Sequence, residues 1–411
     1  MTKAKETRPK SYYVWLGILV LLLGAALVTW VYELRHGLGV TGMRDVISWG
    51  IYIFTFAFFV KLSAGGLIVA SSAEVFGIRA LKPLARLGVL TAASSILVAG
   101  ISIIPDLGKP SRILNLIIHP NWSSPLIWDV TIISCYFVLA ALELWLMYHG
   151  INSFKKQKQL KVLAYIGLPA AFALHSITGW IFGLQIARPF WNSAIMAPLF
   201  VVSAILSGTA LITIIIWLLQ KYAGVEFAED TWGKLRGLMA ISLAIDLFFL
   251  FCEYVTILWG NVPKDILALK MILPGGNFAV LFWLEWVVGG IIPLILFAAP
   301  WIHRRVGLTA VSASLILVGV YAFQIELTTV GMANPLIQLA PGTSIGTYTP
   351  GNSVFQLVGQ YAPTWVEYVI IFGLVALLAL LISLGYHLLN VKESMALEGH
   401  ELADKEILKG A

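Results

Sequence analysis

Ionisable side chains inside long apolar runs are the residues of this sequence that most clearly suggest chemistry. Asp129 lies one helical turn inside the start of one run, and His175 lies near the middle of the next. Other runs contain five more such groups: Lys61, Asp246, Glu253, Glu285 and Glu326. Charges in hydrocarbon are costly and usually face a bundle interior or a water-filled cavity. Their staggered depths favour a proton path or a polar cavity; for Lys61 and Asp246 alone, a structural ion pair is the alternative.

A segment rich in charge and proline, IPDLGKPSRILNLIIHPNWSSPLIWD, separates two of the runs. Asp106 can cap a turn, Pro110 fixes the backbone after it, and Arg112 is close enough in sequence to pair with Asp106. These features favour a rigid interfacial turn. Trp128 and Asp129 follow just inside the next run. An aromatic ring beside a protonatable group suits a quinone, which packs against the ring and accepts a hydrogen bond and then a proton.

The elements that position these residues are membrane spans. Apolar residues make up 59% of the chain and charged residues only 12%, whereas soluble domains contain roughly 25% charged residues. A span needs about 20 apolar residues. This rule predicts an all-α polytopic membrane protein, a single membrane domain with ten spans: 12–33, 46–75, 84–104, 126–149, 162–184, 194–220, 237–259, 278–300, 306–329 and 364–389.

The distribution of Lys and Arg predicts the orientation of the spans. Most of the 27 Lys and Arg residues fall in the loops on the side of the N-terminus, which predicts that both termini are cytoplasmic. The first span lacks a small-residue cleavage site and is expected to be retained. The extracytoplasmic loop 331–363 contains no charge, and it is either a docking surface or a disordered connector. The tail 390–411 is predicted to be a solvated cytoplasmic end. Glu143 lies near a span end and is expected to reach the interface.

Several cofactors are disfavoured by the residues available. The cysteines, Cys135 and Cys252, are far apart and form no CxxC, which disfavours an iron–sulfur or zinc site. Only His175 among the seven histidines is clearly at mid-membrane, so a bis-histidine haem is not expected. The sequence contains no phosphate-binding loop, nucleophile elbow or HExxH motif. We therefore expect no metal, no redox cofactor bound by this chain and no nucleic-acid partner.

The same segments resemble a known family. DLGKPSR followed by HPNWSSPLIWD resembles the conserved loop of the NrfD-like, or polysulfide-reductase-type, membrane subunits. GMRDVISWGIYIFTFAFFVKLSAGG is similar to their first shared span, and LHSITGWIFGLQIARPFWNSAIMAPLFVVSAILSG to their next shared block. The resemblance covers spans two to nine. One departure is Lys109, where arginine is usual and the charge is kept.

The resemblance implies two four-helix bundles, 46–184 and 194–329, flanked by the first and last spans. It implies a quinone site near the outer face of the first bundle, with Asp129 as a polar contact and Trp49 and Tyr52 lining the pocket. It also implies menaquinone as the bound substrate and an extracytoplasmic iron–sulfur protein as the partner. The resemblance further implies other redox subunits, either a multihaem cytochrome or a molybdopterin-type protein. It places the chain among the lipids of a bacterial cytoplasmic (inner) membrane.

The predicted function is therefore that of a quinone-reactive membrane subunit of a respiratory oxidoreductase complex, with proton uptake or translocation from the cytoplasm. Asp129 and His175 would exchange protons with the quinone. A secondary transporter or ion channel is the alternative, for which Gly65-Gly66 and Gly289-Gly290 hint at paired helix breaks. A purely structural anchor for a soluble enzyme is the third interpretation.

Overall fold

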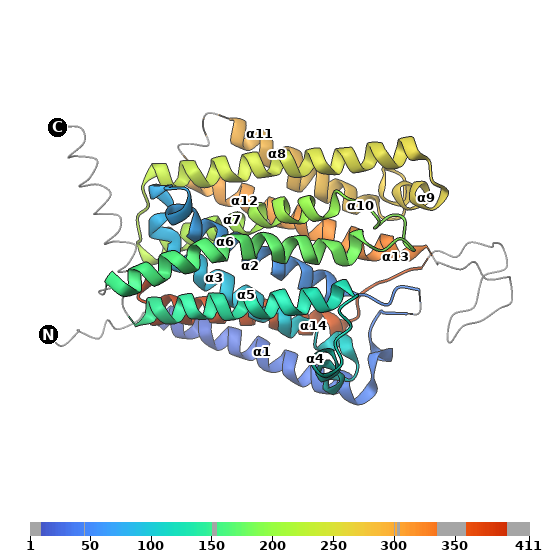
Figure 1. The fold of residues 1–411 in the computed structure, drawn as a ribbon, viewed down its shortest axis with the longest axis horizontal. Coiled ribbons are helices and arrows are strands. Elements are labelled where there is room, and N and C mark those ends of the chain that lie inside the picture. The colour runs from blue at the N-terminus through green and yellow to red at the C-terminus, as the bar shows by residue number, and fades with distance from the viewer. Residues whose placement is uncertain are drawn as a thin grey trace.

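The structure is a computed structural model that describes residues 10–44, 46–149, 154–299, 301, 305–334 and 359–392. These residues form helices and connecting turns, with no β-strand in the parts described. Within these residues, ten helical stretches are long and apolar enough to cross a membrane, so the predicted all-α polytopic fold is confirmed. They run side by side along the long axis of the molecule (Figure 1): α1 (Lys10–His36), α2 (Ile51–Val75), α3 (Ala85–Ser102), α5 (Pro125–Tyr148), α6 (Phe154–Gly183), α7 (Met196–Ala223), α8 (Glu229–Gly260), α10 to α11 (Ala279–Ala298), α12 to α13 (Val306–Ala333) and α14 (Trp365–Leu388).

The helices pack in two groups around a central pair. Helices α2, α3, α5 and α6 contact one another, and α7, α8, α12 and the segment η5 (Trp283–Ile291) form the second group. Helix α2 packs against α7 between the groups, where Gly65 and Gly208 bring the two backbones together. A Cβ on Gly65 would lie 2.5 Å from the carbonyl oxygen of Ala204. Small residues allow this close approach, which strengthens packing where no water drives association.

Helices α1 and α14 form an outer pair beside the first group, and α14 also contacts α3. Tyr12 and Trp15, near the start of α1, donate hydrogen bonds to the backbone oxygen and the side chain of Ser383 near the end of α14. These two ends therefore lie together, and we call this side of the molecule the basic end. The opposite side, where α1 ends and α14 begins, is called the loop end. Thr364 and Glu367 form a capping box that starts α14 there.

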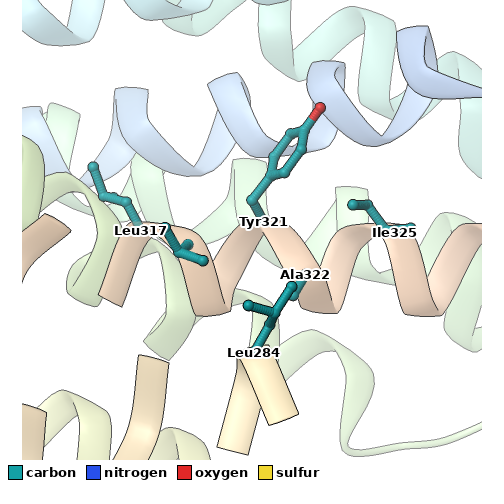
Figure 2. Close-up of a pocket in the computed structure, with 6 residues that line it drawn as sticks. Leu284, Leu317, Tyr321, Ala322 and Ile325 are labelled. Carbon is teal, nitrogen blue, oxygen red and sulfur yellow. The ribbon is translucent and has the colours of Figure 1, made fainter. Parts of the chain in front are cut away.

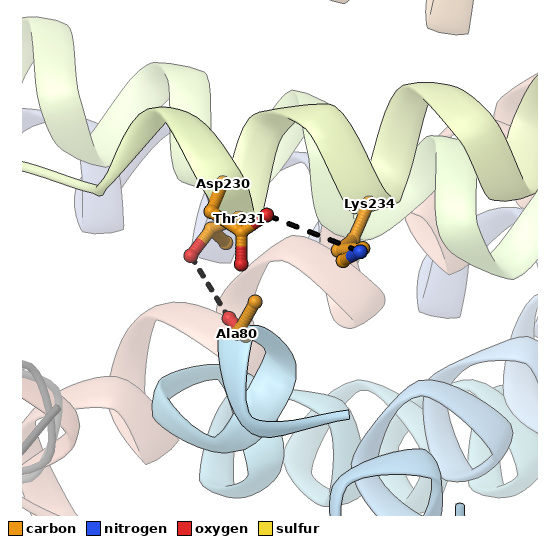
Figure 3. Close-up of polar contacts among 4 residues, drawn as sticks. All are labelled: Ala80, Asp230, Thr231 and Lys234. Atoms are coloured by element: carbon orange, nitrogen blue, oxygen red, sulfur yellow. Dashed lines mark hydrogen bonds and ion pairs between the residues drawn. The ribbon is translucent and has the colours of Figure 1, made fainter. Parts of the chain in front are cut away.

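Polar contacts at the basic end connect α8 to the turn that precedes α3. Thr231 donates a hydrogen bond of 2.9 Å to the carbonyl oxygen of Ala80 in η2 (Arg79–Leu84), as Figure 3 shows. Lys234 lies 4.0 Å from Asp230 one turn away on α8, but both side chains are exposed, so this pair contributes little to stability. The buried Thr231 contact therefore fixes the start of α8.

The glycine pairs that hinted at broken helices lie in continuous helix. Gly65 and Gly66 fall within α2, and Gly289 and Gly290 fall in η5, a π-helical segment that continues into α11 (Ile292–Ala298). Gly289 approaches Gly319 of α12 closely, as Gly65 approaches Gly208. These glycines permit close helix packing and do not unwind the chain.

Short helices cover the loop end: η3 (Pro105–Leu107), η4 (Pro110–Leu114) and α4 (Asn115–Ile118) before α5, and α9 (Pro263–Ile272) after α8. Gly108 adopts a φ of 60°, which a glycine permits without strain, between η3 and η4. Most of the predicted loop 331–363 and of the tail 390–411 lies outside the described residues. At the edges of that loop, the backbone N–H of Gly359 donates to the carbonyl oxygen of Ala333 over 2.7 Å.

Candidate functional site

Asp129 is buried near the loop end, on the face of α5 that packs against α6. Its side chain is 2% exposed, and one carboxylate oxygen accepts a hydrogen bond of 2.6 Å from the hydroxyl of Thr178. Ser124 accepts a hydrogen bond from the backbone of Leu126 and starts α5, with Pro125 at the first helical position. This cap places Asp129 in the second turn of α5.

His175 lies one turn from Thr178 on α6 and is 1% exposed. Its Nδ1 lies 3.0 Å from the carbonyl oxygen of Ala171. A carbonyl can only accept, so Nδ1 carries the hydrogen and Nε2 keeps its lone pair. His175 therefore keeps one ring nitrogen, Nε2, buried against the backbone of Val60 on α2 and without a hydrogen bond of good geometry.

An aromatic stack lies between these α6 residues and the loop end. Trp49 stacks on Trp191 with ring centroids 5.6 Å apart and an interplanar angle of 15°, and Phe182 meets Trp49 edge-on at 6.0 Å. The guanidinium of Arg188 lies 5.1 Å from the Trp191 ring and donates to the carbonyl oxygen of Gly331. Burial lowers the pKa of Arg188 from its ordinary value. The stack forms a largely buried aromatic layer near the loop end.

One face of α6 connects Asp129 and His175 to the aromatic stack. His175, Thr178 and Phe182 follow at helical spacings of three and four residues, so they share a face of the helix. The structure therefore brings together Asp129, His175 and Trp49 along this face. This face therefore places a buried carboxyl group and a buried imidazole in line with the aromatic stack.

Two residues predicted for the same site point elsewhere. The Trp128 indole donates to the carbonyl oxygen of Trp122 in the preceding turn. The Tyr52 hydroxyl donates a hydrogen bond of 2.5 Å to Glu33 of α1. Both side chains make local structural contacts in this conformation.

The bond between Tyr52 and Glu33 belongs to a carboxyl-rich cluster that the sequence reasoning missed. Glu367 of α14 accepts from the Tyr361 hydroxyl over 2.6 Å, and Glu33 and Glu367 are 2% and 0% exposed. Asp106 lies within electrostatic range of both glutamates, and its Oδ1 is buried without a hydrogen bond. Burial and the bond to Glu367 raise the pKa of Tyr361 far above its ordinary value, so it stays a donor. We call these five residues the flanking cluster.

The predicted pair between Asp106 and Arg112 is wrong. Arg112 is exposed in η4 and forms no ion pair within the part of the chain that the structure describes. The 3₁₀ turns of η3 and η4 direct Asp106 inward to α1 and α14 and leave Arg112 at the surface. Sequence proximity did not reveal which side of the turn each residue occupies.

The second ionisable group lies around Lys61, at the boundary between the two groups of helices. Lys61 is fully buried, donates to the Ser203 hydroxyl over 3.1 Å and lies 4.3 Å from the Phe200 ring centroid. The predicted direct ion pair with Asp246 is absent among the described residues, although the two charges interact electrostatically, as do Lys61 and Glu285. Ser203, Asp246 and Glu285 line one narrow cavity, with room for roughly one water molecule.

Both glutamates predicted in the later spans lie in π-helical segments. Glu285 falls in η5, and Glu326 begins η7 (Glu326–Val330). Their carboxyl groups interact, and Tyr254 donates to Glu326 over 3.0 Å. π-helical turns within α-helices are frequent at functional sites. Glu253 is separate, because its carboxylate accepts from Ser193 near the loop end.

The cavity drawn in Figure 2, with a volume of about 290 Å³, is not the candidate site. Leu317, Tyr321 and Ile325 of α12 and Leu284 of η5 are among its lining residues, and Figure 2 shows Tyr321 directed toward a neighbouring helix. The Tyr321 hydroxyl already bonds to Thr55 over 2.8 Å. This lining offers no free polar group, so it suits a hydrocarbon chain and lacks a partner for a quinone carbonyl.

Fold and geometry define a polytopic membrane protein that buries two groups of ionisable side chains, one around Asp129 and His175 and one around Lys61. Residues 39–334 match the family described as "Polysulphide reductase, NrfD". The chain is 34% identical to a putative dimethyl sulfoxide reductase membrane subunit of Halobacterium salinarum, over 92% of each chain. It is 26% identical to the "Hdr-like menaquinol oxidoreductase integral membrane subunit" of Archaeoglobus fulgidus, over 92% of this chain and 94% of that one.

A third relative is the "Menaquinone reductase, integral membrane subunit" of Nitratidesulfovibrio vulgaris, which is 22% identical over 93% of this chain and 92% of that one. The chain belongs to the NrfD family, and the resemblance found in the sequence is confirmed. The family match ends before α14 and begins after α1. The flanking cluster therefore joins helices outside the matched region to helices within it.

Proposed function

We propose that this chain is the quinone-reactive membrane subunit of a respiratory oxidoreductase complex and exchanges electrons between an extracytoplasmic iron–sulfur partner and menaquinone. The observation that carries the proposal is the buried row of Asp129, Thr178 and His175, which leads into the aromatic stack. Two of the relatives are named as menaquinol or menaquinone oxidoreductase subunits, which supports the choice of quinone. The chain takes part in catalysis as a subunit and relies on the iron centres of its partners.

Reduction of a quinone to a quinol requires two electrons and two protons, and the residues of this chain would handle the protons. Asp129 would donate a hydrogen bond and then a proton to a quinone oxygen, while Thr178 holds its carboxyl group in place. His175 would return a proton to the row through Nε2. Trp49 would pack against the ring, and Tyr52 would join only by exchanging its bond to Glu33. Quinol oxidation would run the same transfers in reverse.

The loop end is the side on which we place the partner. Both chain termini would then be cytoplasmic, in the cytoplasmic membrane of a bacterium or archaeon, in agreement with the distribution of Lys and Arg. The turn that contains Asp106, Pro110 and Arg112 would shape the entrance to the quinone site. A multihaem cytochrome or a molybdopterin-type protein would supply or accept electrons through the iron–sulfur protein.

We further propose that the second group of helices moves protons from the cytoplasm during turnover. Lys61, Asp246 and Glu285 surround the narrow cavity, and Glu326 extends this group toward the loop end. Glu253 would be the outermost member. In vesicles, replacing Asp246 and Glu285 by their amides should lower the number of protons moved per electron. An unchanged ratio would refute this part of the proposal and leave quinone binding intact.

Quinone content tests the central proposal. The protein is purified in mild detergent as wild type, Asp129→Asn and Asp265→Asn, and the tightly bound quinone is extracted and quantified beside fluorescence quenching by a quinone analogue. Asp265 is a control carboxyl at the loop end, in the short helix α9. We expect bound quinone in the wild type and the control, and weaker binding in Asp129→Asn. No quinone and no quenching in any of the three proteins would favour a transporter or a structural anchor.

A further inference from the structure

The buried face of α5 carries two ionisable groups, Tyr136 and Glu143, in line with Asp129 and without a role in the proposed function so far. Most of this helix is exposed on its outer face, but Asp129, Tyr136 and Glu143 are 2%, 0% and 3% exposed. Two intervals of seven residues separate them, so all three lie on one face of α5. The expectation that Glu143 reaches the interface is therefore wrong, because its position on the helix turns it into the bundle.

Glu143 is a buried carboxyl without a matching cation. Its Oε1 has no hydrogen-bond partner, and no ion pair involves it within the described part of the chain. Gly167 of α6 faces it, since a Cβ at that position would lie 3.5 Å from Oε1. A carboxyl left unpaired at such depth is costly, and intramembrane carboxyls of this kind commonly belong to proton pathways.

Two groups fill the distance between Glu143 and Asp129. The Tyr136 hydroxyl donates to the carbonyl oxygen of Ser63 on α2 over 3.1 Å. The Nε2 of His175 faces the backbone of Val60, three residues earlier on the same helix. Because Val60 and Ser63 are three residues apart on α2, the His175 ring and the Tyr136 hydroxyl lie about 4.5 Å apart along the axis of that helix. Tyr136 is the one nearer the basic end.

Positions along the axis of α6 give the same order of these groups between the loop end and the basic end. Thr178 donates a hydrogen bond to Asp129 and so marks its level on α6. Along the axis of α6, His175 lies about 4.5 Å closer to the basic end than Thr178, and Gly167 about 16 Å closer. On α5 the Cα atoms of Tyr136 and Glu143 lie about 10 Å and 21 Å from that of Asp129. Helical side chains lean toward the N-terminus, which brings Glu143 back to the level of Gly167. Along the helix axes the four ionisable groups thus follow one another at steps of about 4.5, 4.5 and 7 Å, which one or two water molecules can bridge.

We propose that Glu143, Tyr136 and His175 form a proton row that connects the basic end to Asp129. The row rests on the proposed function, because Asp129 is its delivery point only if Asp129 exchanges protons with a quinone. For each proton that Asp129 gives up, His175 passes one to it, Tyr136 relays one to His175, and Glu143 takes one up near the basic end. This row lies within the first group of helices, whereas Asp246 and Glu285 lie in the second.

The row predicts that protons reach the quinone from the cytoplasmic side although its electrons arrive from the loop end. Each quinone reduced would then separate charge across the membrane without any contribution from the second group of helices. Glu143 would gate this uptake, since it is the member of the row nearest the basic end.

Electrochemical reduction of the bound quinone in the purified full chain, followed by infrared difference spectroscopy, tests the row. The method resolves carboxyl protonation and the rate of quinol formation, and quinone extraction measures binding. We expect Glu143→Gln to lose one carboxyl C=O band and to slow quinol formation by roughly tenfold or more, with unchanged quinone content. Glu143→Asp should restore the band. Tyr136→Phe should slow the reaction without removing a band.

The control is Glu74→Gln, which changes an exposed carboxyl near the last turn of α2, at the basic end of the molecule as Glu143 is. It should behave as wild type. A wild-type band and rate in Glu143→Gln, with quinone bound, would overturn the row and leave the quinone site standing. Absence of quinone from the wild type would instead refute the proposed function and the row with it. The two failures are therefore distinguishable.

Discussion

The hydrogen bond from Tyr52 of α2 to Glu33 is predicted to stabilise the packing of the flanking helix α1 against the bundle. The hydroxyl lies 2.5 Å from the carboxylate, and both side chains are essentially buried. Tyr52→Phe removes the donor, changes the volume by one oxygen atom and leaves Glu33 without another partner in the described structure. Tyr52 was predicted to line the quinone pocket, so the same substitution also asks whether its hydroxyl contributes to binding.

The expected cost follows from burial. A hydrogen bond to a charged group contributes about 1.5–3 kcal/mol in proteins, whereas bonds between membrane helices average about 0.6 kcal/mol with a maximum near 1.7. Glu33 is 2% exposed and its neighbours Glu367 and Asp106 provide no cation, so the loss should fall near the upper membrane value. We expect Tyr52→Phe to lower the free energy of unfolding by about 1.5 kcal/mol.

Reversible unfolding in mixed detergent and SDS micelles measures this loss for Tyr52→Phe, Glu33→Gln and the double variant. The bond predicts a coupling energy of about 1 kcal/mol or more, because the second substitution removes a contact that is already broken. Tyr32→Phe is the matched control on α1, where the side chain is 38% exposed. Additive effects in the double variant would refute the reasoning. A drop in quinone content with unchanged stability would instead assign Tyr52 to the quinone site.

Three further predictions follow from the packing. Gly65→Leu should prevent α2 from packing on α7 and abolish folded protein in detergent, as measured by gel filtration. The control Gly17→Leu, where no atom lies within 4 Å of the added Cβ, should be tolerated. Trp49→Ala should weaken binding of a quinone analogue by roughly two- to tenfold through loss of stacking, and Trp180→Ala, which is 40% exposed, should not. Lys61→Met should reduce proton movement per electron in vesicles without changing quinone content.

The spans and the existence of buried charges could be predicted from the sequence, because both depend on composition along the chain. Every predicted span overlaps a helix of the structure, and Lys61, Asp246 and Glu285 are buried as expected. The position of a helix end was harder. The predicted span 237–259 begins eight residues late, since the polar first turns of α8 extend the helix beyond the apolar run.

Which neighbour each side chain meets could not be predicted, because it depends on how each helix is rotated in the bundle. Tyr52 faces α1, although its resemblance to a quinone-lining position suggested the bundle interior. The distance of Glu143 from the span end, taken alone, predicts that it reaches the interface. Its interval of seven residues from Tyr136, repeated to Asp129, is a signal that the sequence does contain and that would have placed it on the buried face.

Lys61 links the two groups of ionisable residues and makes their charge states interdependent. It interacts electrostatically with Asp246 and Glu285 in the second group of helices, and also with His175 in the first. A protonated His175 and a charged Lys61 repel each other, and at low dielectric this repulsion is strong. If the proposed proton row delivers a proton to His175, this repulsion would favour release of a proton from Lys61 toward the acidic residues around the cavity. If the proton row and the cavity both operate, this repulsion at α2 couples quinone chemistry in one bundle to proton movement in the other, without any helix needing to move.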